Sequence, residues 1–565
     1  MKALHVTYRF GEEIIGGAEK YLWNLSTQLA RQGVELTVAT TTAREFRSPT
    51  RWNVFWKKGY PRGEEHASGL RILRFPFRNH PRWLAALYGI PLQSRFDSEQ
   101  WDFEPPAITA EGGGLLVRGW HFEERSGGAS HRWIGRRAEI AIRDEYVWEV
   151  GFSAYSPWKN SGEVVINGKR IGGFNVNRDI QYFAFKPPEP LSDLNVEIRL
   201  KKARRPWKDL RRLGMIVTAV SYKAGDRTVE IPLHRHYLSL LHERKEELLG
   251  WFEKRAQSRP KRFSRYFDLC RGPFSPELSR YLFLHAREYD IILGHNFPHP
   301  YLAEAVKAGK RAGIPTAALP LAHLEDDYYH WEHYYTALES ADLTFALSDY
   351  SRDIFRERFH ANAHTLGAGI DPGEFESSNT NGDRFRKKYE LQETPIILFV
   401  GRKSWPKRYP ALIRSVRAAS RIHPCRLVMI GPDEDGQSIP PEDALYLGKQ
   451  DRGTILDAYA ACDVFANLSD SESFGMVFTE AWMFEKPVIG YRNCGAVASL
   501  IEEGKDGFLC GSDEETAGRI VEILQNPSLG AGLGRAGREK TLNRFTWEKV
   551  ASRAKELYGE IAGGK

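Results

Sequence analysis

The first forty residues alternate between apolar strands and an amphipathic helix. Residues 4–8 (LHVTY) are mainly apolar, and after a loop Ala18, Tyr21, Leu22, Leu25 and Leu29 recur at helical spacing. Gly33 predicts the end of this helix, and residues 34–40 (VELTVAT) predict a second strand. A strand, a helix and a strand in this order predict a parallel sheet, because the crossover helix lets both strands run in one direction.

The same alternation returns later in the chain. Residues 287–296 and 313–323 predict two further strands of the first sheet, and a second run of strands and helices extends from residue 394 to about residue 544. A chain of 565 residues is too long for one hydrophobic core. The fold class that we expect is therefore α/β, with two Rossmann-like domains.

Between residues 96 and 232 the pattern changes from helical spacing to short strands. Residues 194–200 (LNVEIRL) alternate with period two, and Asn167-Gly168 is a strong hairpin signal. Several short strands separated by glycine and proline predict an antiparallel β-sandwich inserted in the N-terminal domain. Its tryptophans, Trp120 among them, could stack on sugars or fill the core, and the core role is favoured.

Two charged stretches follow apolar strands in the C-terminal part. Residues 401–408 (GRKSWPKR) place Arg402 and Lys407 after the strand at 395–400, and residues 469–480 (SDSESFGMVFTE) place Glu472 and Glu480 after the strand at 463–468. Carboxyl ends of parallel strands meet at one edge of the sheet. Two cations and two carboxylates at that edge predict a pocket for a diphosphate joined to hydroxyl-rich groups, that is, a nucleotide-sugar.

The local chemistry supports this prediction. If a helix begins near Gly475, its first amides carry the positive end of the helix dipole and suit a phosphate. Glycine allows close approach of the ligand, and Arg402 and Lys407 would stabilise a leaving diphosphate. Glu480 would lie about one and a half turns into the helix. The alternative is a surface helix capped by Glu480 with both cations solvated.

At these residues the sequence resembles glycosyltransferase family 4, retaining enzymes of the GT-B fold. The matching positions are Arg402, Lys407, Ser469, Glu472, Phe474, Gly475 and Glu480. Residues 485–510 resemble the segment that follows the Glu pair in the family, and Gly369, Asp371 and Phe375 match its Gly-x-Asp-x-x-x-Phe loop. Departures are Arg408 and Glu485, where the family usually has Gly, and Gly367-Ala368, where Pro-Asn is common.

The resemblance implies a role for each site residue. Arg402 and Lys407 would neutralise the diphosphate with help from the amides near Phe474 and Gly475, and Ser469 would line the donor pocket. Glu480 would hold the ribose hydroxyls and Glu472 those of the transferred sugar. The acceptor would enter past Gly16, Gly17 and His323. Of the two histidines at strand ends, His323 is favoured over His295 for the position near the donor sugar. From the residues alone, Gly16-Gly17 is either a tight turn or a place where backbone meets a ligand.

We expect the following domains, of which the inserted β-sandwich departs from the usual two-domain pattern of the family. An N-terminal acceptor domain is expected at residues 1–95 and 233–375, the inserted β-sandwich at 96–232, a C-terminal nucleotide-sugar-binding domain at 376–548, and a final helix packing back on the first domain at 549–565. The implied reaction is retaining transfer of a hexose from a nucleotide-diphosphate-sugar to a glycan or lipid-linked acceptor, in cell-surface polysaccharide or lipopolysaccharide synthesis, without a metal or other cofactor. No general base is assigned.

Composition and charge fit a cytoplasmic protein at the inner face of a membrane. The chain has no apolar run of about 18 residues, and its first ten residues lack the apolar core expected of a signal peptide. Its five cysteines are odd in number and lack a CxxC pair. A net charge of +7 is too small to predict nucleic-acid binding. Basic and aromatic residues between Trp251 and Arg265 could contact anionic lipid or form a solvated face; a basic face is also predicted at residues 201–212.

Two other functions remain open at this point. The first is a nucleotide-sugar epimerase on the same fold, although epimerases lack this Glu pair. The second is a non-catalytic sugar-binding scaffold whose active part is the β-sandwich. Retention of all four charged residues favours the transferase.

Overall fold

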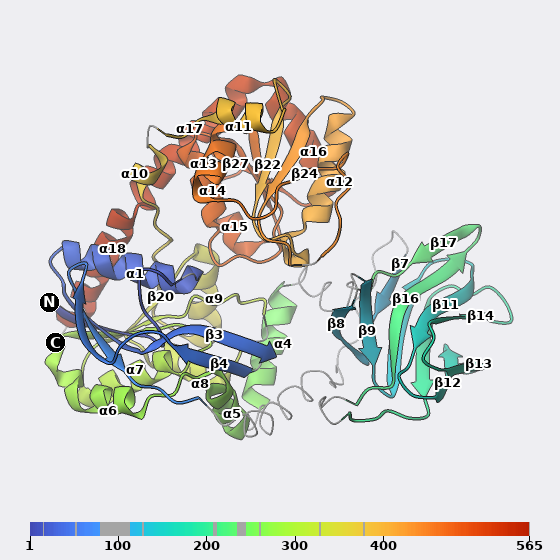
Figure 1. Cartoon of the computed structure of the whole chain (residues 1–565), viewed down its shortest axis with the longest axis horizontal. Coiled ribbons are helices and arrows are strands. Elements are labelled where there is room, and N and C mark those ends of the chain that lie inside the picture. Colours follow the sequence, from blue (N-terminus) through green and yellow to red (C-terminus); the bar gives the residue numbers. More distant parts are fainter. Residues whose placement is uncertain are drawn as a thin grey trace.

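The computed structural model describes residues 1–14, 16–50, 53–79, 113–126, 129–206, 212–233, 245–258, 261–326, 329–376, 379–434 and 436–563. Figure 1 shows two α/β units, one containing both chain ends, and a separate set of strands from the middle of the chain. The expected boundary at residues 95 and 96 lies outside the described residues.

The first unit contains an eight-stranded sheet in the order β21-β20-β19-β18-β1-β2-β6-β5. Only the β5–β6 pair is antiparallel among these described strands. β18 is buried along its whole length, as expected for a parallel strand covered on both faces. The strands are β1 (Lys2–Val6), β2 (Glu35–Thr41), β5 (Gly63–Ala67), β6 (Leu70–Phe75), β18 (Ile291–His295), β19 (Thr316–Leu319), β20 (Leu343–Ala346) and β21 (Ala363–Thr365).

Helices and one hairpin cover this sheet. β1 pairs with β2 on one side and with β18 on the other, so the strand order reverses there and the carboxyl ends of β1 and β18 form a crevice. The covering elements are α1 (Gly17–Arg31), α4 (Lys245–Ser258), α5 (Lys261–Arg271), α6 (Pro276–His285), η1 (Ala286–Glu288), α7 (Tyr301–Ala312), α8 (Glu332–Ser340), α9 (Asp349–Phe359) and the hairpin β3 (Ala43–Thr50) and β4 (Asn53–Lys58).

The second unit has a six-stranded parallel sheet in the order β24-β23-β22-β25-β26-β27. Its strands are β22 (Ile396–Val400), β23 (Arg426–Ile430), β24 (Leu445–Tyr446), β25 (Val464–Asn467), β26 (Val488–Tyr491) and β27 (Gly507–Cys510). The order reverses between β22 and β25, which are the two strands that precede the charged stretches. The sheet therefore brings both stretches to one crevice.

Its helices begin after a short hinge segment and end with the last helix of the chain. They are α10 (Pro372–Phe375), α11 (Gly382–Lys388), η3 (Trp405–Lys407), α12 (Tyr409–Ser420), α13 (Arg452–Ala461), α14 (Met476–Met483), α15 (Gly495–Leu500), α16 (Asp513–Gln525), α17 (Pro527–Arg544) and α18 (Trp547–Gly563). α18 packs on the first unit, where the Tyr558 hydroxyl lies 3.1 Å from His5 Nε2 and Lys555 donates to the Gln32 carbonyl.

The middle of the chain forms two antiparallel sheets. One has the order β13-β12-β15-β10-β7, and the other has the order β14-β11-β16-β9-β8 with β17 beside β16. Inward-facing side chains of both sheets, Val164 and Phe152 for example, belong to one hydrophobic cluster. The strands are β7 (Gly113–Leu116), β8 (Trp120–Ser126), β9 (Ala129–Ile134), β10 (Arg137–Arg143), β11 (Val147–Tyr155), β12 (Asn160–Ile166), β13 (Lys169–Val176), β14 (Gln181–Phe185), β15 (Leu194–Leu200), β16 (Met215–Ala224) and β17 (Arg227–Glu230).

The hairpin prediction is confirmed for these sheets, and the core role is confirmed for Trp120, whereas Trp133, Trp148 and Trp158 are half-buried. Asn167 and Gly168 have φ angles of 47° and 82° and join β12 to β13 as a tight hairpin. Trp120 is buried and its indole N–H donates to the Glu139 carbonyl, so it fills the core and does not present a sugar platform. Trp207 lies outside the described residues.

Among the described residues, no helix is long and apolar enough to cross a membrane.

Candidate functional site

Lys407 and Glu472 meet at the crevice between β22 and β25. Lys407 ends the single turn η3 after β22, and its ammonium group donates to the Glu472 carboxylate. Both side chains are largely buried, with exposed fractions of 13% and 14%. A charge-assisted hydrogen bond in such a site is stronger than an exposed one. Of the predicted site residues, these two form a direct pair.

The carbonyl of Pro406 holds the two loops together. It accepts a hydrogen bond from the Asp470 amide at 2.9 Å and one from the Ser469 hydroxyl at 3.3 Å. Ser469 is fully buried. Ser469 therefore fixes the loop that carries Glu472 against the turn that carries Lys407.

Arg402 pairs with a carboxylate outside the Lys407–Glu472 pair. It donates to Glu434 at 3.2 Å, and its side chain is 57% exposed. The neighbouring Lys403, which the sequence did not single out, is completely buried and lies 2.8 Å from Asp433. Arg402 thus remains able to turn, whereas Lys403 anchors the loop after β22.

The backbone at Phe474 and Gly475 prepares the start of α14. Gly475 has φ 100°, a left-handed value that favours glycine, and a Cβ there would lie 2.9 Å from the Phe478 ring. Phe474 is buried and packs edge-on against Phe545. The Phe474 side chain therefore holds the turn, and only the backbone amides of this segment are available to an anion.

Glu480 lies inside α14, as the sequence predicts, but is separated from the Lys407 pair. It accepts hydrogen bonds from Arg452 at 3.0 Å and from the Tyr459 hydroxyl at 2.9 Å, while Arg452 also reaches Glu374 at 2.7 Å. Sequence reasoning missed Arg452. The only signal was a cation at the start of a predicted helix, which ordinarily has no special meaning.

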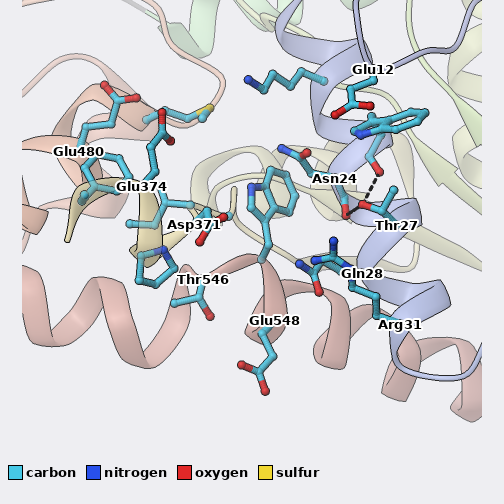
Figure 2. Close-up of a pocket in the computed structure, with 18 of the residues that line it drawn as sticks. Glu12, Asn24, Thr27, Gln28, Arg31, Asp371, Glu374, Glu480, Thr546 and Glu548 are labelled. Atoms are coloured by element: carbon cyan, nitrogen blue, oxygen red, sulfur yellow. Dashed lines mark hydrogen bonds between the residues drawn. The ribbon is translucent and has the colours of Figure 1, made fainter. Parts of the chain in front are cut away.

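Glu480 borders a cavity of about 990 Å³ between the two α/β units. Figure 2 shows Glu374 and Glu480 on one side and Asn24 and Gln28 of α1 on the opposite side. Trp23 also lines the cavity, whereas Lys407 and Glu472 are absent from its described lining. The cavity is polar and wide enough for a nucleoside or a sugar.

His323 lies beside the Lys407–Glu472 pair from the first unit. Its Nδ1 is 3.5 Å from the Ser471 hydroxyl, and that hydroxyl donates to the buried Glu325 at 2.7 Å. Burial lowers the pKa of His323, although Glu472 and Glu325 act in the opposite direction. The imidazole is therefore neutral at pH 7. The Ser471–Glu325 bond, which the sequence did not predict, joins the two units at this point.

Gly16 precedes α1 and Gly17 begins it, and the two glycines differ in their surroundings. A Cβ at Gly16 would lie 2.1 Å from a carboxylate oxygen of Glu19, whereas a Cβ at Gly17 would meet nothing within 4 Å. Glu19 is buried and accepts from Tyr8 and Arg9. Gly16 is therefore required by packing, and the backbone at Gly17 lies open.

His295 is held within the first unit. Its Nε2 lies 3.1 Å from the Ala18 carbonyl and its Nδ1 lies 3.0 Å from the Thr7 hydroxyl. Since a carbonyl can only accept, Nε2 carries the proton and Nδ1 accepts from Thr7. Burial lowers the pKa of His295 to about 4. His295 supports the start of α1, and His323 is the histidine placed beside the charged pair.

The comparison with known families concerns the second unit. Residues 381–540 match the family described as "Glycosyl transferases group 1". The second unit is therefore similar to a group 1 glycosyl transferase domain over residues 381–540, its group 1 domain. This domain contains the Lys407–Glu472 pair and Glu480, so the resemblance stated from these residues is confirmed for this part of the chain.

Curated relatives match over about a third of the chain. The chain is 26% identical over 189 residues to N-acetyl-alpha-D-glucosaminyl L-malate synthase of Bacillus anthracis, covering 32% of this chain and 49% of that protein. It is 28% identical over 215 residues to the capsular polysaccharide biosynthesis glycosyltransferase CapM of Staphylococcus aureus, covering 35% and 56%. The chain thus spans about half the length of these relatives.

Two solved structures align with the chain. Sucrose-phosphate synthase of Thermosynechococcus elongatus aligns with a TM-score of 0.48 and 13% identity, covering 100% of both chains. Anabaena HepE in complex with UDP and glucose aligns with a TM-score of 0.42 and 20% identity, covering 50% of this chain and 82% of that chain.

The group 1 domain departs from its usual glycines at two positions. Arg408 and Glu485 have φ angles of 47° and 54°, which are left-handed values favoured by glycine. The Arg408 guanidinium lies 3.3 Å from Asp470 and 4.0 Å from the centre of the Tyr491 ring. The backbone shape is therefore kept without glycine, and at Arg408 the side chain gains contacts.

Proposed function

We propose that the protein is a retaining glycosyltransferase that moves a hexose from a nucleotide-diphosphate-sugar to a glycan or glycolipid acceptor in cell-surface polysaccharide synthesis. The observation that carries this proposal is the buried Lys407–Glu472 pair at the strand-order reversal of the group 1 domain. The names of the matched relatives, which include a capsular polysaccharide glycosyltransferase, support it.

The donor lies along the carboxyl edge of the group 1 sheet. Lys407 and Arg402 neutralise the diphosphate, Arg402 by turning away from its exposed contact with Glu434, and the amides at Phe474 and Gly475 assist. Glu480 takes the ribose hydroxyls, since its carboxylate borders the cavity facing α1. In this arrangement the Arg452 contact with Glu480 is exchanged for a contact with ribose.

The transfer step breaks the bond between the anomeric carbon and the diphosphate oxygen. A hydroxyl oxygen of the acceptor forms the new bond on the same face of the sugar, and the leaving phosphate takes the acceptor proton. Lys407 stabilises the charge that develops on the leaving group, while Glu472 orients the hydroxyls of the sugar. The step needs no metal in this proposal.

The acceptor enters from the first unit past Gly17 and the neutral His323. We assign residues 1–95 and 233–375 to the acceptor domain and residues 96–232 to an inserted β-sandwich module. α4 and α5 place Lys254, Lys261 and Arg265 on the same unit, and we propose that they contact an anionic membrane at the cytoplasmic face. The side chains of Arg255 and Arg262 lie outside the described residues.

A panel of nucleotide-sugars tests the proposal. Thermal shift with each donor should identify one that stabilises the full chain, and incubation of that donor with acceptor should release free nucleoside diphosphate. An epimerase would convert the sugar and release no nucleoside diphosphate. A scaffold would bind the sugar without turnover. Either of these results would overturn the transferase.

A further inference from the structure

A basic cavity lies on the outer face of the five-stranded sheet in the middle of the chain. The cavity has a volume of about 950 Å³. Val164 and Ile198 of this sheet point into the shared core, so their neighbours Glu163 and Arg199 point outward. The lining includes five cationic side chains, Arg136, Arg137, Arg170, Arg199 and Lys201. None of these belongs to the site described above.

The strand register places the charges in one row. Arg137 of β10 is opposite Arg199 of β15, Arg199 is opposite Glu163 of β12, and Glu163 is opposite Gly173 of β13. Gly173 has no side chain, and a Cβ there would lie 3.4 Å from the Arg170 guanidinium. The row therefore ends at Gly173, and the Arg170 guanidinium lies beside that position.

The cations outnumber the acids that could neutralise them. Arg170 lies 3.0 Å from Glu163, and Arg137 lies 3.4 Å from Glu197, which also contacts Arg199. Arg136 and Lys201 are exposed and have no acidic partner among the described residues. Two arginines directly opposite each other cost stability in an isolated sheet. The cavity retains an excess of positive charge that an anionic ligand would balance.

The shape of the cavity selects among anionic ligands. A membrane would require protruding apolar side chains, whereas Phe174 and Leu200 in the lining are buried, with exposed fractions of 7% and 3%. A single-stranded nucleic acid would require exposed rings for base stacking, and Phe174 is the one aromatic residue in the described lining. Ser161 and Asn175 add hydrogen-bonding groups suited to sugar hydroxyls.

We propose that this basic cavity binds a segment of an anionic polysaccharide, one that carries carboxylate, sulfate or phosphate groups along the chain. This proposal rests on the proposed function, because such a polymer would be the acceptor or product of the transferase. Binding a growing chain here raises the effective concentration of its end near the group 1 domain. The cavity holds the polymer and takes no part in the transfer step.

Calorimetry on the full chain tests the proposal. The probes are oligogalacturonate, which carries carboxylates, a heparin-derived oligosaccharide of equal length, which also carries sulfates, and a neutral dextran oligosaccharide. At least one anionic oligosaccharide should bind at low salt and weaken as salt rises, because exposed charge contacts are screened. The neutral oligosaccharide should not bind measurably. Equal binding of the neutral probe, or no binding of either anionic probe at low salt, would overturn the proposal.

A pair of double variants locates the binding. Arg136→Ser/Lys201→Ser removes two exposed cations without leaving an acid unpaired, and affinity for the anionic probe should fall about tenfold. Lys159→Ser/Lys169→Ser removes the same charge from exposed positions outside the described lining, and affinity should stay within about twofold. Equal losses in both variants would mean a diffuse charge effect and would overturn the site.

Two further probes separate the rival ligands. The probes are anionic vesicles of phosphatidylglycerol and phosphatidylcholine and a single-stranded oligonucleotide. If either binds more tightly than the oligosaccharides, and this binding depends on Arg136 and Lys201, the polysaccharide assignment is overturned. Release of nucleoside diphosphate by the unaltered protein with a short neutral acceptor is measured separately. If no nucleoside diphosphate is released, the proposed transferase activity is wrong. Oligosaccharide binding tests only the basic cavity.

Discussion

The Lys407 ammonium group donates to the Glu472 carboxylate across the crevice between β22 and β25. The two residues are expected to serve different parts of the donor, the diphosphate and the transferred sugar. In this structure they neutralise each other in a largely buried position. Substitution of one residue therefore affects both the donor site and the charge of the other residue.

Lys407→Ala should reduce turnover by about 100- to 1,000-fold, the usual cost of losing one preorganised donor to developing charge. It should also lower the free energy of unfolding by about 1–3 kcal/mol, because Glu472 is left unpaired. Lys407→Ala/Glu472→Gln should recover part of that stability. Arg414→Ala, an exposed cation paired with Asp513, is the control and should keep full turnover. Full activity of Lys407→Ala would exclude its role.

Glu480→Gln should weaken binding of the nucleoside diphosphate about tenfold, the order of one hydrogen bond to a charged group. Glu374→Gln is the matched control because Glu374 shares Arg452 with Glu480 and is not expected to hold ribose. Glu472→Gln should retain nucleoside diphosphate binding and lose discrimination among sugars. Calorimetry with nucleoside diphosphate and with nucleotide-sugar distinguishes the three variants. Identical losses for all three would contradict separate roles.

Gly16→Ala should destabilise the first unit, because the new methyl group would overlap the Glu19 carboxylate that Tyr8 and Arg9 hold in place. The expected loss is about 1–3 kcal/mol, the usual cost of overpacking. Gly17→Ala should leave stability unchanged or slightly raised, since its position is open and helical. Thermal unfolding compares the two variants. A greater loss for Gly17→Ala would contradict this packing.

The first unit should lose stability in mild acid. Burial lowers the pKa of His5 to about 3 and that of His295 to about 4, below the ordinary value of 6.5. As pH falls below about 6.5, the unfolded chain binds protons that the folded chain excludes. The free energy of unfolding therefore falls by about 1.4 kcal/mol per pH unit for each histidine.

Denaturant unfolding between pH 7.5 and pH 4.5 measures this effect. His295→Gln should flatten the dependence on pH, because the folded chain then excludes one proton fewer. An unchanged slope in His295→Gln would show that His295 does not resist protonation in the folded state.

Much of the fold follows from local pattern. Apolar runs of four to five residues at β18, β22 and β25 predict buried parallel strands because such strands are covered on both faces. Asn167-Gly168 predicts the hairpin because both residues accept left-handed backbone. The charged residues after β22 and β25 are predicted to share a crevice because parallel strands end at the same edge.

Side-chain partners were decided by the tertiary structure. Lys407 and Glu472 are 65 residues apart, and the contact between Glu480 and Arg452 depends on how α13 packs beside α14. Arg402 donates to Glu434 in the loop after β23, 32 residues away along the chain.

Sequence alone thus determined several buried strands, the hairpin at Asn167-Gly168 and which charged residues end at one sheet edge, because these depend on local periodicity and on the direction of the chain. Only the tertiary structure decided which of those charges pair and why Arg408 and Glu485 can replace glycine. Both residues have a left-handed backbone, and the partners of Arg408 come from the loop after β25 (Asp470) and from the end of β26 (Tyr491). Such partners are fixed by long-range packing, which local sequence does not encode.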